Sequence, residues 1–435
     1  MDACSIQADN VFGPRVAFCR DGFDFTLLFE QAILSALPSA LLTGASAGCI
    51  FYLSKENVKT KPGVSWSLTA IKQATIACFA LVQLALIVLW ASPSNGPTKL
   101  SLPASVLSLL AGLALGAVSY LQHSRSVRPS AVLSIYLALS ILFDVAQART
   151  LWLREDNANV ASVFTTGLVL KALVLVTELI EKRRFLQAPY CHYPPEALGS
   201  VVNRSVFWWI NSLLVKGSST RLHVSDLFNI DDKLTSNYIV PKFSAKWERA
   251  NKKSSYALMW VSFGCFWINL ASIVVLRFAL TGFKFSQPLL INKAVLLLQE
   301  PDSQDKTNTG RALIGATALI YIGIAVFNGA TRHNIYRLFT MIRCGLVSSI
   351  YKATMNLGVT STHNSVALTL MSTDIECIGQ GFEFLDTIIA DHVEIGIASY
   401  LLYRQIGLSF LAPLLGSIGT CPQRMPAHDQ KLMSC

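Results

Sequence analysis

Five apolar stretches, each about long enough to cross a bilayer, occupy the first 180 residues. A helix needs about 20 residues to span roughly 30 Å of hydrocarbon. The runs that pass this test are residues 25–53, 69–91, 102–122, 131–148 and 160–180. Lipid offers no partners for backbone polar groups, so spanning runs of this kind are helical. The sequence therefore predicts an all-α polytopic membrane protein that begins with a five-span domain, residues 1–180.

Composition agrees with a membrane protein. The chain is 52% apolar and 14% charged, whereas soluble domains are about 25% charged. The formal net charge of +10 comes from basic residues beside the apolar runs, where they mark the cytosolic side. We therefore expect a lipid bilayer as the partner and no nucleic acid. The ten cysteines form no CxxC pair and the histidines are dispersed, so no metal site is predicted.

The charges of the loops predict the orientation of the first five spans. Basic residues gather in alternate loops, at residues 54–66, 122–129 and 181–184, while the other loops are weakly or evenly charged. Under the positive-inside rule, the N-terminus lies outside and the chain emerges in the cytosol at Lys182. The plasma membrane is expected in preference to the vacuolar membrane.

Residues 181–253 are predicted to form a cytosolic linker. They contain 12 Lys or Arg and 6 Asp or Glu, a net charge of +6 that suits the anionic cytosolic leaflet. Within the linker, Ser205 is expected to cap a short amphipathic helix that Gly217 ends. The side chains predicted to contact the membrane are Phe207, Trp208 and Trp209. A second helix is predicted over residues 240–253.

Residues 254–418 form a second membrane block. Residues 258–298 are about twice as long as one span, and Gly282 and Pro288 allow a kink. Residues 312–357 predict a continuous helix of roughly 65 Å that projects into the cytosol. Residues 384–403 predict a further span, whereas the run at 408–418 is too short to cross.

Charged residues inside the second block are the strongest functional lead. Each costs about 2.5–3.5 kcal/mol near the bilayer centre unless it faces a wet cavity. Arg277 and Lys284 are seven residues apart and share a helix face, whereas Lys293 points the opposite way if the helix is unbroken. These cations either snorkel to an interface or line a cavity that attracts organic anions. Glu394 is either their partner or part of a solvated helix entry.

No motif for phosphate chemistry is present in these 435 residues. The sequence has no Gly-Lys dipeptide, so GxxxxGK[ST] is absent, and no segment resembles LSGGQ. No ATP hydrolysis, no catalytic residue and no bound cofactor are therefore expected for this chain. Gly379-Gln380-Gly381 is interpreted as a helix hinge.

The linker residues PEALGSVVNRSVFWWINSLLVKGSSTRLHVSDLFNIDDKL, followed by a Trp247-containing basic helix, resemble the lasso linker of ABCC-type ABC exporters. FGPRVAFCRDGFDFTLLFEQAILSALPSALL resembles the start of filamentous-fungal members, and FKFSQPLLINKAVLLL resembles their sixth span. IYKATMNLGVTSTHNSVALTLMSTDIECI resembles the first intracellular loop. The resemblance implies a coupling helix that docks on a nucleotide-binding domain, with residues Met371, Ser372, Thr373, Asp374, Ile375 and Glu376.

The resemblance implies a five-span accessory domain, a lasso linker and part of a type-1 exporter core. Full-length relatives use ATP and Mg²⁺ to export organic anions, drugs or secondary metabolites. The sequence differs from the family pattern at two positions that bear on substrate class. Leu296 stands where a cation is expected, and Ile389 stands where a Trp is usual. The family likeness ends before the polar tail, residues 419–435, within what resembles the ninth span.

We therefore expect an N-terminal fragment of such an exporter that lacks the nucleotide-binding domains and is not transport-competent alone. The alternative is a regulatory or scaffolding membrane module, acting through the five-span domain and the lasso.

Overall fold

The chain folds into two compact units, Met1–Asn229 and Ile230–Cys435, in the computed structural model. The structure describes residues 6–13, 16, 25–61, 66–93, 96–154, 158–251, 253–254, 256–299, 301, 304–355, 369–412 and 415–416. The predicted linker, residues 181–253, is divided between the two units. The predicted tail, residues 419–435, lies outside the described residues.

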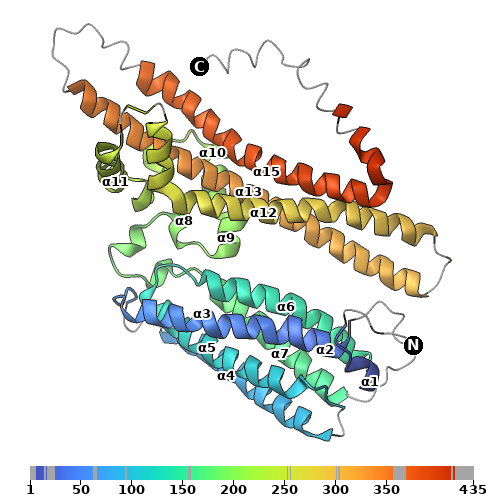
Figure 1. The fold of residues 1–435 in the computed structure, drawn as a ribbon. Helices are drawn as coiled ribbons and strands as arrows, with labels where there is room; N and C mark the ends of the chain where they lie inside the picture. The colour runs from blue at the N-terminus through green and yellow to red at the C-terminus, as the bar shows by residue number, and fades with distance from the viewer. Residues whose placement is uncertain are drawn as a thin grey trace. The chain divides into compact units, whose positions relative to one another are not determined.

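The N-terminal unit contains the five predicted spans as long helices that run side by side (Figure 1). After the short α1 (Ile6–Asp9), the first span comprises α2 (Leu27–Phe29), a π-helical segment (Glu30–Ala36) and α3 (Leu37–Ser54). The other four are α4 (Trp66–Ala91), α5 (Ser101–Arg125), α6 (Ala131–Trp152) and α7 (Ala158–Leu179). The π-helical segment, which has wider turns than an α-helix, precedes Pro38. Proline has no N–H to donate to the preceding helical turn.

Packing inside this unit joins α4 to α5 and α7, α3 to α5, and α6 to α7. Two apolar clusters fill the interior, one around Leu115 and Leu137 and the other around Leu86 and Trp90. The outer faces are also apolar: for example, the side chain of Val88 is 70% exposed. A helix that is apolar on its inner and outer faces is typical of a membrane span.

The first part of the linker follows α7 as short helices within the N-terminal unit. These are α8 (Pro195–Leu198), α9 (Val201–Ser205), a 3₁₀ turn (Trp208–Ile210) and α10 (Asn211–Ser219). The predicted cap is wrong, because Ser200 and not Ser205 accepts the capping hydrogen bond, from the N–H of Asn203. The helix also breaks at Phe207, whose φ of 56° is left-handed. Gly217 does not end α10, which continues to Ser219.

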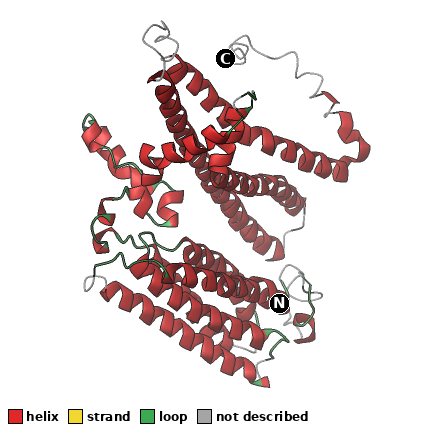
Figure 2. Cartoon of the chain, turned by 60° about the vertical axis from the view of Figure 1, so that its left-hand side comes forward, coloured by secondary structure: helices red, strands yellow, loops and turns green. Residues whose placement is uncertain are grey.

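The described residues of the C-terminal unit form three long α-helices and one shorter α-helix, which are drawn in red in Figure 2. They are α11 (Ser236–Arg249), α12 (Ala257–Gln299), α13 (Gln304–Met355) and α15 (Ile375–Ile406). The α11 helix begins four residues before the predicted position, after Thr235. The 52 residues of α13 form one helix, about 78 Å long at 1.5 Å per residue. The long continuous helix that the sequence predicts is thus confirmed as far as Met355, whereas its projection into the cytosol stays a prediction.

The predicted kink in α12 is in the wrong place. The helix passes through Gly282 and Pro288, and its one non-helical residue is Phe266, with φ −119° and ψ 25°. Phe266 is buried with the apolar side chains of α11, α13 and α15, so tertiary packing surrounds the deviation. Propensity alone points to the glycine and the proline instead.

Within the described residues, seven helices are long and apolar enough to cross a membrane: the first five spans, α12 and α13. The predicted span at residues 384–403 lies in α15, which is not one of the seven. This stretch contains Asp386, Asp391 and Glu394, and three acidic residues lower its apolar character. Among the described residues, length and composition therefore identify seven candidate spans, and α15 is not one of them.

Close packing between helices explains why two positions of the C-terminal unit, 345 and 379, are occupied by glycine. A Cβ on Gly345 would lie 2.9 Å from Cγ of Phe243, so α11 packs directly on the backbone of α13. A Cβ on Gly379 would collide with the ring of Phe339. The helix α15 runs straight through Gly379, so the predicted hinge is wrong at this position. Gly379 instead makes room for an aromatic ring.

Candidate functional site

Three residues at helical spacing on α12 meet one carboxylate of α15. Arg277, Thr281 and Lys284 occupy positions i, i+4 and i+7, which share one helix face. Thr281 donates a hydrogen bond of 2.9 Å to Oε1 of Glu394, and Lys284 Nζ lies 3.3 Å from the same oxygen. Arg277 Nη2 lies 3.8 Å from it. Of the two roles predicted for Glu394, the structure thus supports the partner of the cations.

The charges of this group balance. Arg277 Nη2 also lies 3.8 Å from Oδ1 of Asp391, so two cations face two carboxylates: +2 − 2 = 0. The Arg277 side chain is 12% exposed and that of Lys284 is 39% exposed. Arg277 Nε is buried and makes no hydrogen bond among the described residues. The net charge of the group is therefore neutralised.

Lys293 lies outside this group. It is exposed on α12, and nine residues from Lys284 place it on the opposite face of the helix. The sequence predicted this geometry for an unbroken helix, and α12 is unbroken over that part. The structure thus brings together three of the four residues predicted for a cavity.

The residues predicted as a coupling helix do not form a separate helix. Leu370–Asp374 is a π-helical turn that runs directly into α15. Ile375 is 2% exposed and packs in the core of the C-terminal unit, whereas Glu376 is exposed and lies 3.7 Å from Arg343. Ser372, Thr373 and Asp374 are exposed, and Met371 is half-buried. Ile375 is therefore buried in the core of this unit and is not exposed for docking.

The two linker tryptophans have different environments. Trp208 is 66% exposed, whereas Trp209 is half-buried and its ring centroid lies 6.1 Å from that of Phe228. Both tryptophans lie in a 3₁₀ turn that follows the left-handed Phe207, and successive residues of such a turn point about 120° apart. Trp208 is therefore free to contact a lipid surface, and Trp209 holds the linker together.

Sequence reasoning missed four charged residues inside the N-terminal unit. Lys72 pairs with Glu178 at 3.1 Å, and Lys171 pairs with Asp144 at 2.5 Å. All four side chains are less than 10% exposed. The signal was available, because the predicted spans contain two cations and three carboxylates, Glu30 being the third, and charged groups inside a span need partners.

The Lys171–Asp144 pair borders a polar cavity of about 20 Å³ within the helix bundle. That volume holds about one water molecule. The cavity is therefore too small for an organic ligand, and the two pairs serve to hold α4, α6 and α7 together. The ion pairs of the N-terminal unit are structural, whereas the Glu394 group is more exposed.

Comparison with known proteins finds similarity to fungal ABC transporters. Residues 9–165 match the family described as the ABC transporter TMD0 domain. The chain is 37% identical to the ABC transporter atnG of Emericella nidulans over 96% of its own length. It is 37% identical to ABC multidrug transporter B of Aspergillus fumigatus and 38% identical to ABC multidrug transporter lscH of Purpureocillium lilacinum, each over 94% of its length. The chain spans 27%, 28% and 26% of these three relatives.

Proposed function

We propose that this chain, whose similarities support an ABC transporter family, forms the N-terminal membrane part of an exporter of the ABCC-like kind. The proposed cargo is organic anions, drugs or secondary metabolites. Two of the similar proteins are named as multidrug transporters, which supports this proposal. The observation that carries it within the structure is the meeting of Arg277, Lys284 and Glu394 between two long helices.

Glu394 acts as a built-in counter-ion in this proposal. The carboxylate satisfies Lys284 and Arg277 when no cargo is present, which lowers the cost of burying the two cations. An organic anion offers the same chemistry and takes the place of Glu394 beside Arg277 and Lys284. The balanced charge favours exchange of one carboxylate for another over permanent retention of an anion.

ATP chemistry is assigned to other domains. No GxxxxGK[ST] loop occurs in the 435 residues, so we propose that they neither hydrolyse ATP nor transport cargo alone. Nucleotide-binding domains that carry ATP and Mg²⁺ are the proposed partners. Their proposed contact on this chain is the exposed part of residues 371–376, with Glu376 at its end.

A chimera tests the proposed cargo site. Residues 1–412 replace the corresponding part of Aspergillus fumigatus ABC multidrug transporter B, and ATP-dependent uptake of a fluorescent organic anion is measured in inside-out vesicles. Arg277→Ala is expected to reduce anion uptake about tenfold or more, since it removes a charge-assisted contact of about 1.5–3 kcal/mol. Lys293→Ala, on the opposite face, is the matched control.

Equal uptake by the Arg277→Ala and parent chimeras, at equal surface expression, contradicts the proposed site. Uptake of a neutral drug by the same vesicles shows whether a loss is specific for anions. The 435-residue chain alone, reconstituted in liposomes, is expected to show no ATP-dependent uptake. Sequencing the transcript past codon 420 adds a direct check: an open frame that reaches GxxxxGK[ST] and LSGGQ supports the exporter.

A regulatory or scaffolding module is the second candidate. The observation that favours it is that the N-terminal unit has its own buried clusters and forms a compact unit. Deleting residues 1–180 from the chimera distinguishes the two roles. Retained uptake with loss of delivery to the plasma membrane, the proposed location, supports a trafficking module; lost uptake with normal delivery opposes it.

A further inference from the structure

The N-terminal unit contains a cavity that the proposed transport function does not use. It has a volume of about 560 Å³, within the usual range of about 300–1,000 Å³ for small-molecule pockets. It lies where α4 begins, at Trp66, and where α5 ends, around Tyr120 and Ser124. The full lining is Val58, Thr60, Lys61, Trp66, Thr69, Ala70, Gln73, Tyr120, His123, Ser124 and Gln187.

One wall of this pocket is held in place by backbone hydrogen bonds. Residues 59–61, the last described segment before α4, lie between the end of α5 and the chain after α7: Lys59 N donates to Ser124 O at 2.9 Å, and Lys61 N to Phe185 O at 2.8 Å. Thr60 and Leu186 form an isolated antiparallel bridge. Gln187 Nε2 completes the wall with a 3.0 Å bond to Thr60 O. Three distant parts of the chain therefore build this wall.

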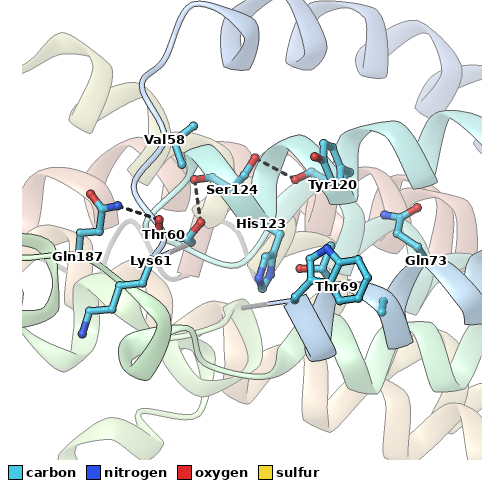
Figure 3. A pocket seen from close by; sticks show the side chains of 11 residues that line it. Val58, Thr60, Lys61, Thr69, Gln73, Tyr120, His123, Ser124 and Gln187 are labelled. Atoms are coloured by element: carbon cyan, nitrogen blue, oxygen red, sulfur yellow. Dashed lines mark hydrogen bonds between the residues drawn. The ribbon is translucent and has the colours of Figure 1, made fainter. Parts of the chain in front are cut away.

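The opposite wall is formed by the two spans. Gln73 Nε2 of α4 donates to the carbonyl of Gly116 on α5 at 3.1 Å, which fixes the separation of the helices. Figure 3 shows Lys61, Thr60 and Gln187 on one side of the pocket and Tyr120 and Gln73 on the other. The pocket thus has a basic, polar side and an aromatic side.

The position and chemistry of the pocket match a membrane–water boundary. Trp66 is 79% exposed and Tyr120 is 56% exposed, and both residue types are enriched at membrane interfaces. Basic residues surround this end of the bundle: Lys55, Lys59, Lys61, Arg125, Arg128, Arg183 and Arg184, against Glu56 and Glu181. Lys59 is already paired with Glu56 at 2.8 Å. Lys61 is exposed at the pocket and is the cation best placed for a ligand.

We propose that this pocket binds an anionic phospholipid. Its phosphate and headgroup lie beside Lys61, Thr60 and Gln187, and the upper part of one acyl chain lies against Trp66, Ala70 and Tyr120. The charge of the rim favours an anionic headgroup over a zwitterionic one, and the aromatic side accepts hydrocarbon. The lipid joins the segment before α4, the end of α5 and the start of the linker.

Photolabelling of the whole chain tests this site. The 435-residue protein is placed in phosphatidylcholine nanodiscs that contain a small amount of a phosphatidylserine with a diazirine near the start of one acyl chain. A phosphatidylcholine with the same chains is the parallel probe. Mass spectrometry then locates the labelled peptides. We expect phosphatidylserine to label the peptides around Lys61 and Trp66 roughly fivefold more than phosphatidylcholine does, the effect of about one basic residue at a membrane surface.

Variants separate the pocket from the general surface. Lys61→Glu is expected to lower phosphatidylserine labelling to the phosphatidylcholine level, whereas Lys55→Glu, nearby but outside the pocket, leaves it unchanged. Ala70→Trp fills the exposed aromatic side and is expected to reduce labelling by both probes. Ala77→Trp, two turns along α4 and also exposed, is its control.

Three results would overturn the proposal. They are equal labelling by the two probes, equal losses in Lys61→Glu and Lys55→Glu, or labelling spread evenly over α3 to α7. Competition by a sterol that removes all label at the pocket, while an excess of unlabelled phosphatidylserine does not, would assign the cavity to a neutral lipid instead. Near-identical thermal unfolding of the four variants ensures that a loss of label reports on binding.

Discussion

Lys72 Nζ lies 3.1 Å from Oε2 of Glu178, and the two side chains are 1% and 2% exposed. One belongs to α4 and the other to α7, two helices that pack along their length. Ser119 of α5 also donates a hydrogen bond to Glu178. The pair therefore joins three spans of the N-terminal unit by charge where apolar packing alone would leave their register less defined.

Removing one partner of this pair should destabilise the unit strongly. Lys72→Met leaves the Glu178 carboxylate buried without its cation, a loss of about 3–5 kcal/mol in comparable buried pairs. The measurement is the thermal unfolding midpoint of the chain in detergent. The double variant Lys72→Met with Glu178→Met is expected to recover much of the loss. A single and a double variant that unfold at the same temperature would show that the pair does not act as a unit.

The two linker tryptophans should respond differently to truncation. Trp208→Ala is expected to weaken binding of the linker to anionic liposomes by about tenfold, because a large exposed apolar side chain contributes about 1.5–3 kcal/mol when it enters an apolar phase. Trp209→Ala is expected to lower the unfolding temperature instead, through loss of its contact with Phe228. Flotation with liposomes measures the first effect. Unchanged flotation of Trp208→Ala would contradict the interfacial role.

An ion pair anchors the part of the linker just before α11 to α13. Asp231 Oδ2 lies 2.6 Å from Arg337 Nη2, and both side chains are largely buried. Asp231→Asn is expected to cost about 1.5–3 kcal/mol, the range for hydrogen bonds to charged groups. Limited proteolysis before α11 reports the loosening, with Asp232→Asn, which is exposed, as the matched control. Equal proteolysis of the two variants would rule out an anchor at Asp231.

Stability of the N-terminal unit should rise with pH above neutrality. Burial lowers the pKa of Lys182 from 10.5 to about 7; Lys72 acts in the same direction, and Glu178 opposes both. Between about pH 7 and pH 10 the unfolded chain therefore binds one more proton than the folded chain, so unfolding becomes less favourable as pH rises. Below about pH 7 both states are protonated and this contribution is constant.

Lys182→Gln should flatten this pH dependence while keeping a donor for the carbonyl of Gln122, which Lys182 Nζ contacts at 2.7 Å. Unfolding midpoints between about pH 6 and pH 10 measure the slope. Lys55→Gln, which changes an exposed lysine, is the control. A slope in Lys182→Gln equal to that of the parent would assign the pH dependence to another group.

The positions of the first five spans followed from apolar length, because a spanning helix has to be long and apolar whatever it packs against. The continuity of α13 was likewise predictable from its lack of proline. The kink in α12 was not: the helix accommodates Gly282 and Pro288 and deviates at Phe266, within the buried cluster it shares with α11 and α13. A local preference of a few kcal/mol yields to packing when many buried contacts depend on the backbone path.

In the candidate site, too, some features could be predicted from the sequence and others depended on packing between helices. Helical spacing on the sequence placed Arg277 and Lys284 on one face and Lys293 on the other, because residues on one helix follow a fixed rotation. The choice of Glu394 as partner, with Thr281 and Asp391 beside it, depended on how α15 lies against α12. That pairing involves residues more than 100 positions apart, for which no local pattern exists.

By itself, the sequence determined that this is a multi-pass helical membrane protein with five early spans, a basic linker and charged residues on a later helix. Those properties depend on residue composition and on distances along one helix. Only the tertiary structure decided that Lys72 meets Glu178, that Trp208 and Trp209 have different environments, and that Arg277 and Lys284 are neutralised. The physical reason is that ion pairs and buried contacts depend on distances between segments, which the folded chain alone defines.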